Sequence, residues 1–204
     1  MDDYLKRLRE AKDLKALADI TQACHRCPLR GGCQHVVFGE GNPAAQLVLC
    51  GEGPGAEEDR LGKPFVGRAG QLLDQILAAC GFERLRHLFI LNIVKCRPPG
   101  NRTPSEEEIT ACLPNLRMQV HLLQPKIMVL MGNCAAQTIL QTDLGISQLR
   151  GQWVQKGRIW FMPTYHPAAL FHRPALKKPV WDDFREVVDK YRTLIDPRHV
   201  SPHC

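Results

Sequence analysis

The chain has 204 residues, which suits one domain with a substantial core and is short for two. Its hydrophobic content of 44% and charged content of 24% are those of an ordinary globular protein and exclude a disordered or fibrous chain. No apolar run is long enough to span a bilayer, and the acidic, polar first residues exclude a secretory signal, so we expect a cytoplasmic protein. The net charge of +6 is compatible with a polyanionic partner but does not require one.

The predicted elements alternate between helices and short apolar strands. An amphipathic helix is expected at the N-terminus, over residues 1–23. Apolar runs bounded by turn residues predict strands at 46–50, 88–94, 127–131 and 159–162. Further helices are expected at 71–79, 105–123, 133–140 and 181–194, the second of them opened by a capping box of Ser105 and Glu108. The last residues, 197–204, are predicted to form a flexible tail.

Strands that are apolar on both faces and alternate with helices indicate a parallel sheet covered on both sides. We therefore predict an α/β fold: a single-domain, three-layer α/β/α architecture with a central four-stranded parallel sheet. Ligands of such folds bind at the carboxyl ends of the strands. Three unusual segments follow directly on strands and should converge on one site: 51–55, 92–104 and 165–167.

The stretch Cys50–Gly70 carries the strongest local signal of a binding site. Gly51, Gly53 and Gly55 alternate just after the first strand, so the backbone can turn sharply and a ligand can approach its N–H groups. Phe65 follows and offers an aromatic face. These residues predict a pocket for a flat, polar ligand such as a base.

Nine cysteines in a reducing compartment indicate metal ligands, catalytic groups or core residues rather than disulfides. Cys24 and Cys27 form a tight chelating pair, and Cys96 and Cys112 form a looser one. Four thiols suit either zinc or an iron–sulfur cluster. The loose second pair favours a cluster, with Cys33 as a possible substitute ligand. Core cysteines with one accidental pair are the alternative.

These segments together resemble the family 4 uracil-DNA glycosylases, the iron–sulfur type of bacteria and archaea. The resemblance runs in order from Cys24 to Arg192. The matching segments are Cys24-x2-Cys27, Val37-Phe38-Gly39-Glu40-Gly41-Asn42-Pro43, Gly51-Glu52-Gly53-Pro54-Gly55 with Glu58-Asp59, Gly62-x-Pro64-Phe65-Val66-Gly67-x-Ala69-Gly70, Asn92-Ile93-Val94-Lys95-Cys96-Arg97-Pro98-Pro99, Cys112, Gly151-x-Trp153 and His166-Pro167-Ala168.

The resemblance implies a repair enzyme that flips uracil out of DNA and hydrolyses its N-glycosidic bond, leaving an abasic site. It implies a structural 4Fe–4S cluster held by Cys24, Cys27, Cys96 and Cys112, a ligand set in which Cys33 has no counterpart. The implied partner is uracil-containing DNA, single- or double-stranded. We expect a monomer in the bacterial or archaeal cytosol, with no membrane partner.

The resemblance also assigns the uracil pocket. Phe65 would stack on the base, and the Asn92 amide would bind uracil O4 and N3–H and so reject cytosine. His166 would stabilise negative charge on uracil O2. The backbone at Gly53 and Pro54 would face the O2 side, and Glu58 would exclude thymine's methyl group, unless Glu58 is only a helix N-terminal acid.

Glu52 is the best candidate for positioning the attacking water or stabilising the sugar cation. An equally weighted alternative is that it only accepts hydrogen bonds from loop N–H groups. With Asn92 and His166 it completes the expected catalytic set.

After the histidine, Leu170 or Phe171 would enter the duplex as a wedge, the alternative being an anchor to the core. The basic residues expected to hold phosphates are Lys95, Arg97, Arg102 and Arg173, followed by Lys177 and Lys178. Each of these, taken singly, could be a solvated surface charge.

The competing hypothesis is an iron–sulfur electron carrier or redox sensor without glycosylase activity. Such a protein needs neither the glycine loop nor Asn92 nor His166, which favours the enzyme.

Overall fold

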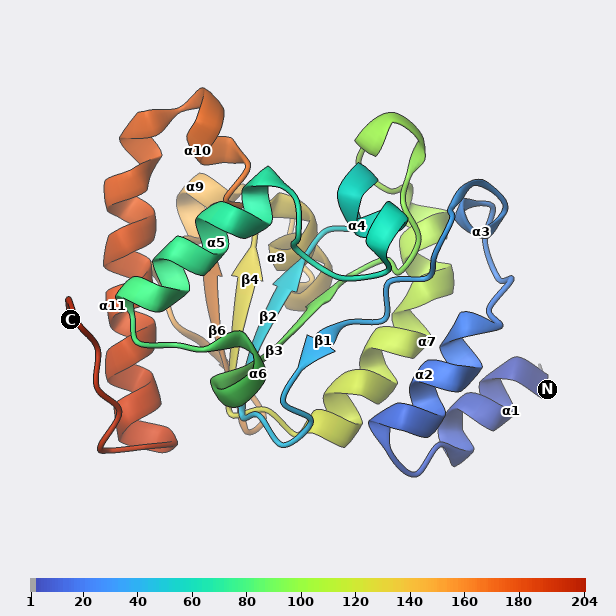
Figure 1. Cartoon of the computed structure of the whole chain (residues 1–204), viewed down its shortest axis with the longest axis horizontal. Coiled ribbons are helices and arrows are strands. Elements are labelled where there is room, and N and C mark those ends of the chain that lie inside the picture. Colours follow the sequence, from blue (N-terminus) through green and yellow to red (C-terminus); the bar gives the residue numbers. More distant parts are fainter. Residues whose placement is uncertain (1–2) are drawn as a thin grey trace.

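The centre of the fold is a six-stranded sheet with the strand order β1-β3-β2-β4-β6-β5. The computed structural model describes residues 3–204 (Figure 1). The strands β2 (Leu47–Gly51), β3 (Leu88–Asn92), β4 (Ile127–Met131) and β6 (Ile159–Thr164) are parallel to one another. This is the predicted parallel sheet.

Two short antiparallel strands at the edges raise the strand count from the predicted four to six. They are β1 (Glu40–Gly41), which pairs with β3, and β5 (Val154–Lys156), which pairs with β6. Neither carries an apolar run, because an edge strand with exposed or half-exposed side chains does not need one. The sequence pattern therefore could not reveal them.

Each central strand is buried on both faces, and alternate residues serve two separate cores. In β2, Val48 and Cys50 pack into one core, whereas Leu47 and Leu49 pack into the other. The first core is covered by α1 (Asp3–Glu10), α2 (Leu14–Gln22), α7 (Glu106–Leu123) and α8 (Asn133–Leu140). The second is covered by α5 (Arg68–Ala79) and α11 (Lys177–Leu194). The three-layer α/β/α arrangement follows (Figure 1).

The remaining helical segments are short and lie mainly near the ends of the strands. They are α3 (Leu29–Gly32), α4 (Ala56–Leu61), α6 (Arg84–His87), α9 (Ile146–Leu149), α10 (Ala169–His172) and two 3₁₀ turns, Pro99–Asn101 and Pro174–Leu176. None of the helices in residues 3–204 is long and apolar enough to cross a membrane.

The N-terminal helix is two helices rather than the predicted one. The first helix ends at Glu10, and Asp13 caps the second by accepting a hydrogen bond from the backbone N–H of Ala16 at 2.7 Å. The predicted capping box of α7 is present: Ser105 N–H donates to Glu108, and Glu108 N–H donates to the Ser105 hydroxyl.

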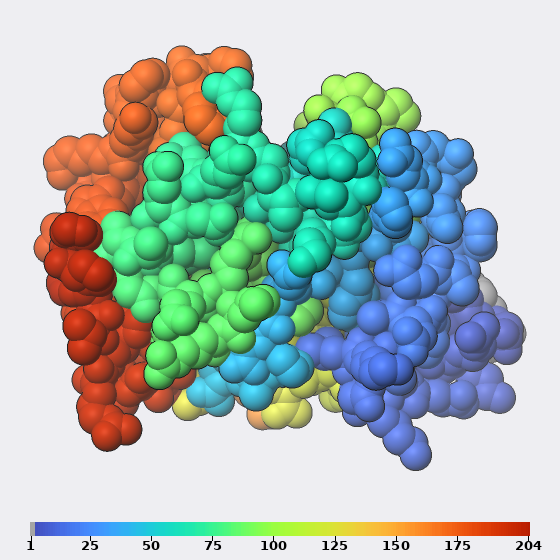
Figure 2. All heavy atoms as spheres, viewed as in Figure 1, coloured from blue at the N-terminus to red at the C-terminus, as the bar shows by residue number. Residues whose placement is uncertain are grey.

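The C-terminal residues pack against the body of the protein, which differs from the expected flexible tail. The ring of His199 stacks on Phe82 with centroids 4.5 Å apart, and its Nε2 lies 2.9 Å from the carbonyl oxygen of Cys80. The Ser201 hydroxyl donates to the carbonyl of Ala79 at 3.1 Å. The end of the chain therefore covers the end of α5, and Figure 2 shows the red C-terminal residues against the green ones.

Candidate functional site

A cavity of about 530 Å³ opens beside the carboxyl ends of the central strands. Its walls come from the loop after β2, the first residues of α4 and α5, the loop after β3 and the segment after β6. The predicted convergence of three post-strand segments is therefore confirmed. All the residues expected to bind uracil line this cavity: Glu52, Gly53, Pro54, Glu58, Phe65, Asn92 and His166.

The floor of the cavity lies where β2 and β3 end together. Gly51 pairs with Asn92 at this point, and a Cβ on Gly51 would lie 2.5 Å from Asn92 Oδ1 and 2.6 Å from Cζ of Phe65. Only glycine leaves room there for both side chains. The glycine thus brings the amide and the aromatic ring to the same spot.

Asn92 is 1% exposed, and its Oδ1 has no hydrogen-bond partner within residues 3–204. A buried acceptor without a partner costs on the order of 1–3 kcal/mol. An unpaired buried acceptor needs an explanation, and a bound ligand that supplies the missing donor is one. The floor of the cavity therefore offers an unpaired hydrogen-bond acceptor.

Phe65 is held in the left-handed region, with φ of 53°, which is uncommon for a bulky residue. Its carbonyl accepts a hydrogen bond from Arg84 Nη2 at 2.7 Å, and a Cβ on Gly70 would lie 1.9 Å from that carbonyl oxygen. The ring lies 5.5 Å from the ring of His166, tilted by 32°. Backbone strain of this kind concentrates at functional sites. It fixes the ring as one face of the cavity.

His166 is neutral near pH 7, because burial lowers the pKa of its imidazole to about 4 against the opposing effect of the Glu58 carboxylate. Its Nδ1 accepts a hydrogen bond from the backbone N–H of Ala168 at 3.2 Å. The proton of the neutral ring is therefore on Nε2, which can donate a hydrogen bond. An Nε2–H donor of this kind is suited to an acceptor that gains negative charge, without requiring a charged imidazole.

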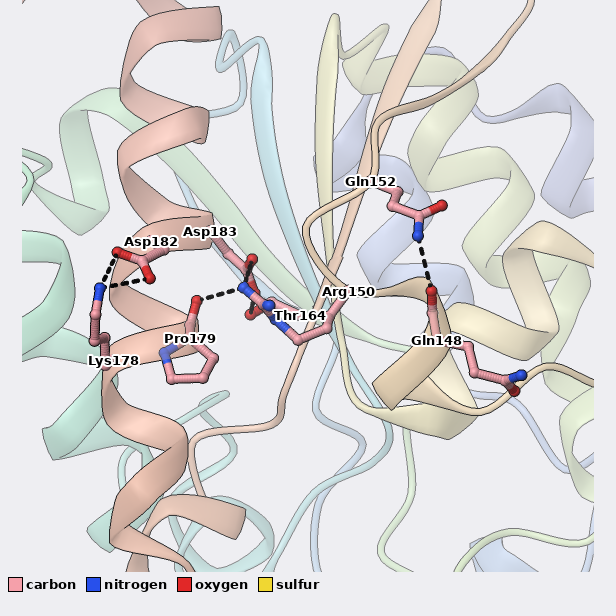
Figure 3. A network of polar contacts seen from close by, with 8 residues as sticks. All are labelled: Gln148, Arg150, Gln152, Thr164, Lys178, Pro179, Asp182 and Asp183. Carbon is pink, nitrogen blue, oxygen red and sulfur yellow. Dashed lines mark hydrogen bonds and ion pairs between the residues drawn. The ribbon is translucent and has the colours of Figure 1, made fainter.

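A buried polar network holds the end of β6, two residues before His166 (Figure 3). The Thr164 hydroxyl donates to Asp183 Oδ2 at 2.6 Å, and Arg150 donates to both oxygens of the same carboxylate. Arg150 Nη2 also donates to the carbonyl of Pro179 at 2.8 Å, in the first turn of α11. The network thus joins β6, α11 and the turn that follows α9.

Glu58 has a structural contact as well as a place in the cavity wall. Its Oε1 accepts hydrogen bonds from the backbone N–H groups of Val66 and Gly67, at 2.9 and 2.8 Å. Gly67 caps α5, so the carboxylate fixes the loop that carries Phe65 to the start of that helix. Glu58 therefore acts as an acid at a helix N-terminus, the alternative role that the sequence allowed, and the helix is α5.

Glu52 lies between the main cavity and a second one of about 350 Å³, because it lines both. Burial raises the pKa of its carboxyl, and a hydrogen bond with the side chain of Thr103 opposes that rise. A carboxylate with a raised pKa in a cleft is suited to accept a proton.

A second cluster, on the α2 side of the sheet, is made of cysteines. Cys24, Cys27, Cys96 and Cys112 line one narrow cavity of about 20 Å³, and Cys33 does not. Within residues 3–204 no three potential ligands converge closely enough for a single metal ion. A cluster with several iron atoms is held by thiols on its periphery, so its donor set does not have to meet at one point. Four thiols around one cavity fit that group in number and chemistry.

Lys95 was predicted to hold a DNA phosphate, and this is wrong. The side chain is 1% exposed and lines the cysteine cavity, where burial lowers the pKa of its ammonium to about 8. Its Nζ donates to the backbone carbonyl of Asn92 at 2.6 Å. A side chain in this position cannot reach DNA.

Leu170 is 3% exposed and packs into the core with α5 and α11, which favours the alternative of an anchor to the core over a duplex wedge. Phe171, its neighbour on α10, is 41% exposed. The guanidinium of Arg68, which lines the cavity, lies 4.8 Å from the centre of the Phe171 ring. Only Phe171 of the two candidates is available to a partner.

The three arginines predicted to hold phosphates differ in their surroundings. Arg102 lines the cavity and makes a bidentate ion pair with Glu108, with distances of 2.7 and 2.8 Å. Arg97 donates from Nε to the side chain of Asn101 at 2.7 Å. Arg173 is exposed at the end of α10.

Several residues at the site had no role predicted from the sequence. Arg68 and Thr103 are the two that matter most, one beside Phe171 and the other beside Glu52. Arg68 lies inside the matched segment that ends at Gly70, which was the available signal. Thr103 and the Arg150–Asp183 pair gave no signal, because their contacts join segments far apart in the chain.

Comparisons with known proteins agree with these features. A model of the uracil DNA glycosylase superfamily matches residues 38–185. The type-4 uracil-DNA glycosylase of Sulfurisphaera tokodaii is 40% identical over 183 residues, covering 85% of this chain and 83% of that protein. Those of Pyrobaculum aerophilum and Thermotoga maritima are 41% and 37% identical, covering 81% and 85% of this chain and 88% and 92% of those proteins. The chain therefore belongs to the type-4 family of the uracil DNA glycosylase superfamily.

Proposed function

We propose that the protein removes uracil from DNA by hydrolysing the N-glycosidic bond, which leaves an abasic site and an uncut strand. The observation that carries this proposal is the unpartnered, buried Oδ1 of Asn92 at the floor of the cavity. Uracil N3–H supplies the missing donor, whereas cytosine presents an acceptor at that position. The membership of the type-4 family supports the same substrate.

The base would enter the cavity after the nucleotide is flipped from the duplex. Phe65 would stack on its face, and the Asn92 amide would read N3–H and O4. The backbone at Gly53 and Pro54 would face O2, and Glu58 would close the edge that carries a methyl group in thymine. These roles rest on the residues that line the cavity.

Bond cleavage would send the electron pair of the C1′–N1 bond to the uracil ring, where the charge gathers on O2. The Nε2–H of neutral His166 would donate to that oxygen. Water would then attack C1′, and Glu52 would orient this water and accept its proton. The raised pKa of Glu52 and the lowered pKa of His166 support this division of roles.

We further propose that Cys24, Cys27, Cys96 and Cys112 hold a 4Fe–4S cluster. Such a cluster supplies a covalent link between segments rather than chemistry on the base. Here it would tie the α2–α3 segment to the loop after β3 and to α7. Cys33, outside the lining of the cavity, is not needed as a ligand.

For DNA binding we propose that Phe171 fills the gap left by the flipped base and that Arg97, Arg102 and Arg173 contact phosphates. The exposed ring of Phe171 supports the first role. The predictions of a monomer and of one domain over residues 1–204 stay predictions. An electron-transfer protein is not favoured, because it would have no use for the residues of the cavity.

The test is a labelled oligonucleotide with one uracil, incubated with the protein and then treated with alkali. Cleavage at the uracil only after alkali is expected, with none at cytosine or thymine in the same position. Asn92→Ala and His166→Ala should each lower the single-turnover rate by roughly 10²–10³-fold. An oligonucleotide that stays intact at stoichiometric protein would overturn the proposal.

A further inference from the structure

Lys95 is among the largest fully buried side chains within residues 3–204, and it is the only charged one in that group. A lysine is almost never fully buried unless its charge is balanced. Its backbone is fixed as well, because the carbonyl of Lys95 accepts a hydrogen bond from Val37 N–H at 2.7 Å. The ammonium is therefore held in place inside the protein rather than folded back from the surface.

The partners of this ammonium are unusual. Within the described part of the chain no carboxylate lies within ion-pair distance of Nζ. The thiols of Cys24, Cys27, Cys96 and Cys112 line the same narrow cavity as Lys95. Among residues 3–204, Nζ makes a single hydrogen bond, 2.6 Å long, to the carbonyl of Asn92. The side chain thus spans from the cysteine cavity to the floor of the uracil cavity.

We propose that Lys95 is a positioning residue that links the two cavities. Its ammonium balances the negative charge of the cysteine ligands, and its hydrogen bond fixes the main chain at Asn92. This inference rests on the proposed function for the meaning of the Asn92 contact. The charge-balancing role rests only on the burial of Lys95 beside the thiols.

The buried ammonium has opposite effects on the stability of the iron-free and the iron-loaded protein. Without bound iron no anionic cluster lies beside the buried ammonium, which then has no counter-charge within ion-pair distance and is a cost to folding. With four thiolates present, the same ammonium offsets their net negative charge. A lysine that merely fills space would stabilise both forms equally.

The test compares Lys95→Met with the wild type, because methionine keeps much of the length and loses the charge. Three quantities are measured: iron per chain during a chelator challenge, thermal unfolding of the iron-free protein, and kcat and KM for a uracil oligonucleotide. We expect about tenfold faster loss of iron and about tenfold higher KM in the variant, the size seen when residues behind metal ligands are changed. The iron-free variant should unfold at the same or a higher temperature.

Lys126→Met is the matched control. Lys126 also donates from Nζ to a backbone carbonyl, that of Leu194 at 2.7 Å, but it lines neither cavity. This variant should keep the iron retention and the KM of the wild type. Lys95→Gln, which restores a donor without a charge, should recover the KM more than the iron retention.

Three results would overturn the inference. One is a Lys95→Met variant that keeps the iron retention and the KM of the wild type while its iron-free and iron-loaded forms both unfold at a lower temperature. Another is a wild-type protein that binds no iron at all. The third is a Lys95→Gln variant whose KM is raised, and whose iron retention is lowered, as much as in Lys95→Met. Failure of uracil excision in the wild type would instead refute the proposed function, and the iron measurements would still judge the charge-balancing role.

Discussion

Gly51 and Asn92 face each other at the last step of the β2–β3 pairing, and the absence of a side chain on Gly51 is what gives the Asn92 amide its place. The same space admits the ring of Phe65. The positions of the Asn92 amide and of the Phe65 ring therefore both depend on Gly51. Gly51→Ala would force the amide and the ring apart, so we expect it to abolish measurable uracil excision in the oligonucleotide assay.

Asn92→Ala should lower kcat/KM for uracil excision by roughly 10²–10³-fold and leave the thermal unfolding temperature unchanged or raised. The reason is that Oδ1 of Asn92 has no partner within the described residues, so its removal breaks no internal hydrogen bond. Excision kinetics and thermal unfolding on the same preparations check this.

Asn115→Ala is the control for that prediction, since Asn115 is equally buried but accepts hydrogen bonds from Tyr4 and Thr21. It should lower the unfolding temperature and spare the excision rate of the folded protein. A large loss of stability in Asn92→Ala would mean that the amide has a structural role instead.

Thr103→Val should shift the acid limb of the kcat/KM profile to higher pH. The hydrogen bond with Thr103 lowers the pKa of Glu52 against the raising effect of burial, so its loss raises that pKa further. If Glu52 must be ionised to accept a proton, activity then rises at higher pH than in the wild type. Rates over a pH series are the measurement.

Glu52→Gln completes this test. It should lower the rate by about 10²–10⁴-fold and remove the limb that Thr103→Val shifts. Protonation of His166, whose pKa is about 4, should leave a separate loss of activity at lower pH. An unchanged profile in Thr103→Val would assign the acid limb to another group.

Cys27→Ser and Cys112→Ser should each lose most of the iron and the visible absorbance of the purified protein, because their thiols line the shared cavity. Cys33→Ser should retain both, since Cys33 lies outside that lining. Iron per chain, measured after anaerobic purification, distinguishes cysteines that are ligands from a cysteine that is not. Equal loss in all three variants would place Cys33 in the ligand set.

Thr164→Val should lower kcat about tenfold through His166, because the Thr164 hydroxyl ties the end of β6 to Asp183. Thr164→Ser keeps the hydroxyl and should stay near the wild-type rate. In a His166→Ala background, Thr164→Val should cause no further loss, since the two act as one unit. A rate that falls by the same factor in both backgrounds would indicate that the network acts elsewhere.

The uracil cavity was predictable from the sequence because its residues follow directly on buried strands. Glu52 follows β2, Asn92 ends β3 and His166 lies two residues beyond β6, so the parallel sheet alone brings them together. The apolar runs located those strands, and the order of the motifs identified the family.

Residues whose environment depends on distant segments were not predictable in the same way. Lys95 lies in a loop rich in proline and arginine and was expected at the surface, but residues of α2, α3 and α7 line the narrow cysteine cavity with it, and the backbone N–H of Val37 donates to its carbonyl. Leu170, on α10, was likewise expected to be exposed, but it packs into the core with α5 and α11. The pairing of Arg150 with Asp183 joins positions separated by 33 residues, and no local pattern reveals such a contact.

Arg68→Met should reduce excision from duplex DNA about two- to fivefold while sparing single-stranded DNA, in line with the strength of an exposed cation–π contact. The Arg68 guanidinium lies over the exposed ring of Phe171 and holds it beside the cavity mouth. Only a duplex leaves a gap that Phe171 must fill when the base is flipped. Phe171→Ala should show the same preference for single strands, and the double variant should be no worse than Phe171→Ala alone. The ratio of kcat/KM on the two substrates measures this, and an equal loss on both would place Arg68 in base binding instead.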